Sequence, residues 1–135
     1  MKRKNKQLAL TLILATILIV LILIFRAPIN KQSILTRFVA GENMGFDLGP
    51  GNINFGQIVP GYSASRNITI TNTLERPTLT EIESSGEISN YIIVSDNNFI
   101  LQPNESKNIL FSCFPPKDIE LREYPGKITI TTKKA

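Results

Sequence analysis

An uninterrupted apolar run near the N-terminus constrains this chain more than any other feature. Residues 8–25, LALTLILATILIVLILIF, include no charged side chain, and 14 of these 18 residues are Leu, Ile, Val or Phe. As an α-helix, a run of this length spans roughly 27 Å, which approaches the ~30 Å hydrocarbon core of a bilayer. The run lacks a polar face at 3.6-residue spacing, which argues against a helix of a globular core. We therefore expect a transmembrane helix that binds the lipid bilayer through residues 8–25.

The charges that flank this run predict its orientation. Four basic residues precede the run, whereas only Arg26 and Lys31 follow it closely. The positive-inside rule then places residues 1–7 in the cytoplasm and everything after the helix on the extracytoplasmic side of the cell membrane.

A cleaved signal peptide is the main alternative to a membrane anchor. The apolar region of a signal peptide usually covers about 7–15 residues and ends at a small-x-small site. Here the run is longer, and Phe25, which is not a small residue, stands two positions before Ala27. We therefore favour an uncleaved signal anchor.

The distribution of charge argues against a nucleic-acid partner. The chain has a net charge of +4 and a pI of about 9.4, values that are common among proteins that bind nucleic acids. Five of its 15 basic residues lie within the first 26 positions, so residues 27–135 carry 10 basic and 11 acidic residues, a net charge of −1. A nearly neutral exported part offers no basic stripe to a polyanion.

The inventory of reactive side chains argues against an enzyme. The sequence has no His, and Cys113 is its single cysteine. Zinc sites built from His and Cys, Ser-His-Asp and Cys-His nucleophile systems and an intrachain disulfide are therefore excluded. We expect no catalytic residue, metal, cofactor or small-molecule substrate, although a Ser-Lys or paired-carboxylate enzyme remains an alternative.

Period-2 alternation predicts three strands in the exported part. SASRNITITNT places Ile68 and Ile70 on one face and Asn67, Thr69 and Thr71 on the other. The alternating inward positions of SKNILFSCF and YPGKITITTKK are Ile109, Phe111, Cys113, Ile128 and Ile130.

The remaining segments give weaker signals. We expect residues 26–43 to form a juxtamembrane linker with a short strand at Ser33–Val39. An irregular strand is expected around Ile53 and Phe55, and a bulge is needed to bring Leu79 and Ile82 into phase. NYIIVSDNNFIL predicts two short strands around an Asp-Asn-Asn turn.

Together these patterns predict an all-β domain. Turn signals recur at intervals of about 8–12 residues, and no helical stripe follows Phe25, as in β-sandwiches. Residues 44–135 match the size of an immunoglobulin-like domain, which has about 100 residues. We therefore expect an antiparallel immunoglobulin-like β-sandwich of six to eight strands behind one transmembrane helix.

A resemblance supports this expectation. The motifs GFDL…INFGQIVPGYSASRNITITN…SGEIS…SDNNFILQPNESKNILF…P…EYPGKITI resemble a group of uncharacterised archaeal single-pass membrane proteins with one extracytoplasmic immunoglobulin-like domain. The resemblance covers residues 45–130 and implies the fold and the membrane topology, but no catalytic residues. Where related sandwich modules close with GxYxG, this chain has REYPG, with Arg122 in place of the first glycine.

Two residues have expected roles inside the domain. Tyr124 precedes the last strand, where the tyrosine of an immunoglobulin-like sandwich can donate its hydroxyl to the backbone and fix a corner. The alternative for Tyr124 is an ordinary half-buried aromatic residue.

Cys113 is a free thiol on an inward face and is expected to act as a small apolar residue. The alternative is a disulfide to a second chain.

Two sequons are candidates for N-glycosylation. Asn67 begins Asn-Ile-Thr and Asn104 begins Asn-Glu-Ser. Asn104 lies in a predicted turn and is the better candidate, whereas Asn67 lies on the outward face of a predicted strand.

The acidic residues do not predict a metal site. Glu81, Glu83, Glu87 and the Ser95–Asn98 turn lack the D-x-D-x-D spacing of calcium loops, and calcium needs six to eight converging oxygen atoms. Glu81 and Glu83 share a strand face that we expect to be solvated.

We expect a non-enzymatic role in protein binding, adhesion or cell-surface assembly with an unknown protein partner. The alternative is an extracytoplasmic chaperone that pairs a sheet edge with a client strand. The C-terminal ITITTKKA strand and the VAGENMGFDL segment are candidate edges, which Lys127, Lys133 and Lys134 would guard against pairing.

Overall fold

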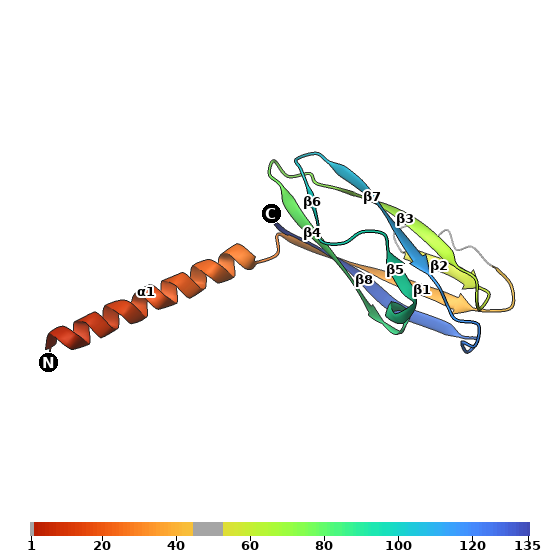
Figure 1. The fold of residues 1–135 in the computed structure, drawn as a ribbon, viewed down its shortest axis with the longest axis horizontal. Helices are drawn as coiled ribbons and strands as arrows, with labels where there is room; N and C mark the ends of the chain where they lie inside the picture. Colours follow the sequence, from red (N-terminus) through yellow and green to blue (C-terminus); the bar gives the residue numbers. More distant parts are fainter. Residues whose placement is uncertain (1, 45–52) are drawn as a thin grey trace.

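The computed structural model describes residues 2–44 and 53–135, so the beginning of the predicted irregular strand lies outside the described residues. An N-terminal helix is followed by a β-rich domain (Figure 1). The elements are α1 (Lys2–Arg26), β1 (Asn30–Ala40), β2 (Ile53–Ile58), β3 (Ala64–Thr71), β4 (Thr78–Gly86), the 3₁₀-helix η1 (Glu87–Tyr91), β5 (Ile92–Val94), β6 (Phe99–Leu101), β7 (Ser106–Cys113) and β8 (Glu123–Lys134).

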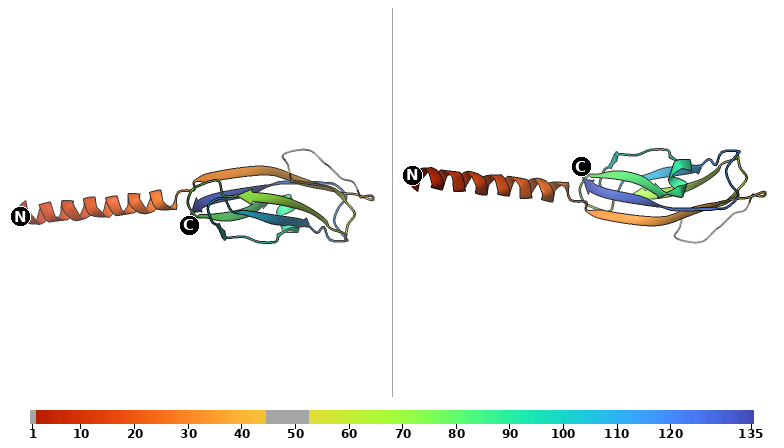
Figure 2. Two further views of the ribbon diagram at one scale, coloured as in Figure 1. Left: turned by 90° about the horizontal axis from the view of Figure 1, so that it is seen from above. Right: turned by 90° about the horizontal axis from the view of Figure 1, so that it is seen from below.

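Helix α1 is an apolar rod that projects from one end of the β domain (Figure 2). An 18-residue window within Asn5–Arg26 has a mean hydropathy of 3.2, and the domain buries none of it. The helix ends at Arg26 because Pro28 disfavours helical backbone at the residue before it. By length and composition α1 fits either a membrane anchor or a signal sequence.

The β domain consists of two packed sheets. The five-stranded sheet has the order β2-β1-β8-β4-β6 and curls into a half-barrel, and the three-stranded sheet has the order β3-β7-β5. The eight strands of the described residues fall within the predicted range. Neighbouring strands are antiparallel except β1 and β2, which run parallel, so the expectation of a fully antiparallel sandwich is wrong at this edge.

The core forms where alternating side chains of the two sheets meet. The inward positions predicted for β7 and β8 are buried, and Ile109, Phe111 and Ile128 have no exposed surface. Ile68 and Ile70 of β3 are partly buried against this core. Since full burial of such a side chain contributes about 1.5–3 kcal/mol, this core holds the two sheets together.

Most of the segment expected to be a linker belongs to the five-stranded sheet. Strand β1 pairs with β8 from Asn30 to Val39, so the domain begins at β1 and not at residue 44. The inward face of β1 becomes apolar from Ile34 onward, apart from Thr36, and Phe38 and Ala40 are buried. Its first four residues are polar and exposed, which explains why they suggested a linker.

The C-terminal strand is central and not an edge, which corrects a second prediction. Strand β8 lies between β1 and β4, so Lys127 and Lys133 cannot guard a free edge. The Ile-Thr alternation would be the same in a central strand and in an edge strand. It indicates which face of the strand is buried, and it does not indicate which strands are its neighbours.

The bulge predicted in β4 is absent. Its register with β8 is continuous from Thr78 to Gly86. Thr78, Thr80 and Ile82 occupy the inward face, and Leu79 points to the opposite side. The prediction failed because threonine fills inward positions that were assigned to apolar residues alone.

Candidate protein-binding face

The outer face of the three-stranded sheet has no charged side chain in the part of the chain that the structure describes. The exposed positions of β3 lie opposite outward residues of β7, and β5 and the residue after β7 extend the same face. We name it the uncharged face, and it comprises Ser65, Asn67, Thr69, Thr71, Ile93, Ser106, Asn108, Leu110, Ser112 and Phe114.

Its polar residues pair with one another across the strands. Ser65 and Ser112 share a hydrogen bond of 2.8 Å, as do Thr71 and Ser106. The Thr69 hydroxyl donates to the Asn108 side-chain oxygen at 2.7 Å. Such cross-strand pairs stabilise the sheet and leave a flat surface of hydroxyl and amide groups.

Three large apolar side chains are exposed on this face. Ile93 is 61% exposed, Leu110 41% and Phe114 49%. Ile93 pairs with Ser112, so Leu110 and Phe114 are its diagonal neighbours on β7 and just beyond it. Together they form an apolar patch around Ser112, which is only 9% exposed.

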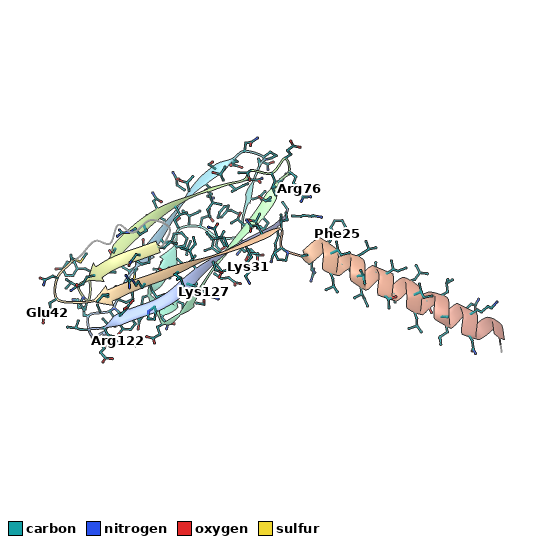
Figure 3. The ribbon with its side chains drawn as sticks, turned by 180° about the vertical axis from the view of Figure 1, so that it is seen from behind. Phe25, Lys31, Glu42, Arg76, Arg122 and Lys127 are labelled. Carbon is teal, nitrogen blue, oxygen red and sulfur yellow. The ribbon has the colours of Figure 1, made fainter. Side chains whose placement is uncertain are left out.

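The outer face of the five-stranded sheet has the opposite character. Its β1, β4 and β8 positions carry seven charged residues: Lys31, Arg37, Glu81, Glu83, Glu123, Lys127 and Lys133. Arg37 pairs with Glu123 at 3.2 Å and Lys133 with Glu81 at 2.5 Å. Lys31 and Lys127 are visible along this sheet in Figure 3.

An uncharged face with exposed apolar side chains is suited to binding another protein. The centre of a protein–protein interface is depleted of charged residues and enriched in aromatic ones. The alternation of β3 and β7 predicted Asn67, Thr69, Thr71 and Leu110 on outward faces, but Ile93 and Phe114 were not predicted there. Three consecutive apolar residues from Ile109 to Phe111 were the available signal for an exposed apolar residue, because a strand with one buried face needs only alternate ones.

The two sequons lie in different surroundings. Asn67 is exposed on the uncharged face, directly opposite Leu110. Asn104 is exposed in a turn with a φ of 62°, and its backbone N–H donates to the Asn72 carbonyl at 2.8 Å. A glycan on Asn67 would cover part of the uncharged face, whereas one on Asn104 would not.

Cys113 lies in the core between the sheets. It has no exposed surface, and its cross-strand neighbours are Ala64 and Ile92. Burial raises the pKa of its thiol to about 12. A disulfide to a second chain would require this strand to leave the core.

Tyr124 connects the long segment before β8 to the core. Its hydroxyl donates to the Glu120 backbone carbonyl at 3.0 Å, four residues upstream. Its ring meets Tyr91 edge-to-face at 5.6 Å, and the Arg122 guanidinium lies 4.1 Å from the ring centroid. The side chain is only 4% exposed, so the hydroxyl hydrogen bond is largely shielded from water.

Three of the acidic residues considered for calcium, Glu81, Glu87 and Asp96, pair with basic side chains. Glu87 pairs with Arg122 at 2.5 Å, and Glu81 pairs with Lys133. Asp96 accepts a hydrogen bond from Lys107, which lowers the pKa of the Asp96 carboxyl. Among the described residues, no group of three or more His, Cys, Asp or Glu side chains is positioned to hold a metal ion.

Comparisons with protein-family models, curated proteins and solved structures find no match to this chain.

Proposed function

We propose that this protein is a membrane-anchored, non-enzymatic binding module. Helix α1 crosses the membrane as an uncleaved anchor, with residues 1–7 in the cytoplasm. The β domain lies outside and presents the uncharged face to a protein partner in adhesion or in a cell-surface assembly.

One observation carries this proposal: the segregation of charge between the two outer faces. Seven charged side chains lie on the five-stranded sheet and none on the described positions of the uncharged face. A charged side chain loses its hydration when a partner covers it, which opposes binding unless a matching charge faces it. The uncharged face avoids this loss.

The exposed apolar surface of α1 supports the anchor. Leu8, Leu23 and Phe25 are each more than 60% exposed, and the whole apolar segment lies away from the domain. A bilayer supplies the apolar surroundings that such a helix requires. The basic residues before the run favour a cytoplasmic N-terminus.

We also propose that the domain is immunoglobulin-like. Its two packed sheets and the bond from the Tyr124 hydroxyl to a backbone carbonyl support this assignment. The resemblance to uncharacterised archaeal membrane proteins stays a prediction from the sequence motifs.

Strand addition has less support than binding through the uncharged face. The edge strands β5 and β6 contain three residues each, too few to present a long pairing template. The two longer edge strands, β2 and β3, lie beside each other, and the Arg66 side chain of β3 donates from Nε to the Asn54 carbonyl of β2 at 2.8 Å.

Site-specific photo-crosslinking in native membranes tests the proposal. A photoreactive leucine analogue is placed at Leu110 of the full chain, or at Leu35 as a matched control. Leu35 is 69% exposed on the outer face of the five-stranded sheet. We expect a protein adduct, either to another protein or to a second copy of the chain, from position 110 and not from position 35. Equal yields at both positions, or none at 110, would contradict the proposal.

A further inference from the structure

Only a short connection separates α1 from the β domain. The helix ends at Arg26 and β1 begins at Asn30, which leaves residues 27–29 between them. Three extended residues reach about 10 Å. Ile29 is already tied to the domain, because its N–H donates to the Thr132 carbonyl at 2.7 Å. If α1 spans a bilayer, the near end of the domain must therefore lie at the level of the lipid headgroups.

This near end is rich in positive charge. Several segments meet there: the start of β1, the loop after β3, the turn before β7 and the end of β8. We name their charged residues the proximal set: Arg26, Lys31, Arg76, Lys133, Lys134, Glu75, Glu81 and Glu105. With five basic and three acidic members, the proximal set has a net charge of +2.

Two contacts fix the position of this end relative to the helix. The Lys134 ammonium lies 5.3 Å from the centroid of the Phe25 ring in the last turn of α1. The Ala135 N–H donates to the Pro77 carbonyl at 3.4 Å, which holds the Arg76 loop beside the end of β8. Figure 3 shows Arg76 and Phe25 at the same end of the domain.

The far end of the domain has the opposite sign. Glu42 and Arg122 mark it in Figure 3. Its described charged residues are Glu42, Glu87, Asp118, Glu120, Glu123, Arg37, Lys117 and Arg122. Five acidic and three basic residues give a net charge of −2. The domain is therefore polarised along its long axis, with its positive end toward the helix.

We propose that the proximal set binds the phosphate groups of anionic lipids and so holds the domain upright on the membrane. This inference rests on the proposed membrane anchor. Surface potential from anionic lipids decays within a Debye length, which is about 10 Å at 0.1 M salt. The short connection keeps Arg76 and Lys134 inside that distance, and repulsion would oppose a tilt that brought the negative far end to the same surface.

The test uses the full chain reconstituted in vesicles and an environment-sensitive thiol dye. A cysteine at Thr73, an exposed neutral residue of the Arg76 loop, carries the dye. Ser63→Cys, near the turn at the far end, is the control position. Cys113 is fully buried and does not compete for the reagent. Vesicles contain phosphatidylcholine alone or mixed with phosphatidylglycerol.

We expect the emission at position 73 to rise roughly twofold in the anionic vesicles, because the loop moves into the headgroup layer. The rise disappears at about 1 M salt, where the Debye length is about 3 Å. The double change Arg76→Glu and Lys134→Glu abolishes it. The change of equal charge Lys117→Glu and Lys127→Glu, away from the near end, retains it.

Equal emission at position 73 in neutral and anionic vesicles, with the wild-type residues at 76 and 134, would overturn the inference. That result needs no charge variant, so misfolding of a variant cannot hide it. Alkaline extraction of the same vesicles tests the anchor separately. Retention in the vesicles without a lipid-dependent signal refutes only the headgroup contact, whereas release by alkali refutes the proposed anchor as well.

Discussion

The ring of Tyr124 on β8 stacks on the ring of Phe38 on β1, with centroids 4.9 Å apart and planes 8° apart. Tyr91 at the end of η1 meets Phe38 edge-to-face at 5.8 Å, so three aromatic rings join β1, β8 and η1 at the far end of the domain. Substitutions in and beside this cluster therefore test the contacts that stabilise the far end of the domain.

The Tyr124→Phe variant tests the hydroxyl hydrogen bond alone, because the aromatic stacking remains. Loss of the bond to the Glu120 carbonyl should lower the free energy of unfolding by about 1 kcal/mol. Chemical denaturation followed by circular dichroism measures this change. Tyr62→Phe is the control, since Tyr62 is 67% exposed and its loss of a hydroxyl should have no effect. Equal stabilities of Tyr124→Phe and the wild type would show that the bond contributes nothing.

The Gly126→Ala variant tests the close approach of η1 to the five-stranded sheet. A methyl group at Gly126 would lie 2.4 Å from Ile88 Cγ2 and from the Ser85 carbonyl oxygen. Because Ile88 is fully buried, the 3₁₀-helix would have to move, and we expect a loss of about 1–3 kcal/mol in unfolding free energy. Unchanged stability would mean that η1 does not pack on β8 as the structure places it.

Burial of Cys113 predicts a dependence of stability on alkaline pH. The pKa of the thiol is raised to about 12 in the folded domain, from an ordinary value of 9.0. The unfolded chain therefore loses this proton first, and the contribution of Cys113 to stability is complete below pH 9.0 and declines as the pH rises toward 12. Lysines and tyrosines also titrate in this range, so the comparison is with Cys113→Ala. The difference in unfolding free energy between the wild type and Cys113→Ala should change as the pH rises from 9.0 toward 12, because the contribution of the thiol declines. A difference that stays constant over this range would contradict the burial of the thiol.

The two sequons should differ in their use, because only Asn67 lies on the uncharged face. We expect Asn104 to carry a glycan in a host that glycosylates exported sequons, and Asn67 to remain bare, since a glycan there would cover the proposed binding surface. Asn104→Asp should remove the added mass while keeping a residue type that tolerates the φ of 62°. Asn67→Gln should leave the mass unchanged. A glycan found on Asn67 in the native host would contradict binding through this face.

The local features of the fold were predictable from the sequence, whereas its pairings were not. Alternation identified the buried faces of β3, β7 and β8 because it depends only on neighbouring residues in the chain. Strand β1 was predicted only in part, as a short strand at Ser33–Val39, because its polar first residues depend on pairing with β8, about 100 positions away in the sequence. The central position of β8 is also set by strand order, which alternation does not encode.

The candidate site was predictable only in part for the same reason. The outward residues of β3 could be assigned from SASRNITITNT, yet nothing local indicated that they lie opposite Leu110 and its neighbours. The charge-free character of the face results from the register of β3, β7 and β5 taken together. Local sequence shows which residues face outward, and the register shows which of them form one surface.

The account depends most on the anchor and the side of the membrane on which the domain lies. Labelling of Ser63→Cys in intact cells with a membrane-impermeant thiol reagent tests both, and the wild type, with its buried Cys113, is the unlabelled control. The account predicts labelling without permeabilisation, on a membrane-bound band of the full 15.1 kDa chain. Labelling that requires cell lysis, or a labelled band shortened by the loss of α1, would contradict it.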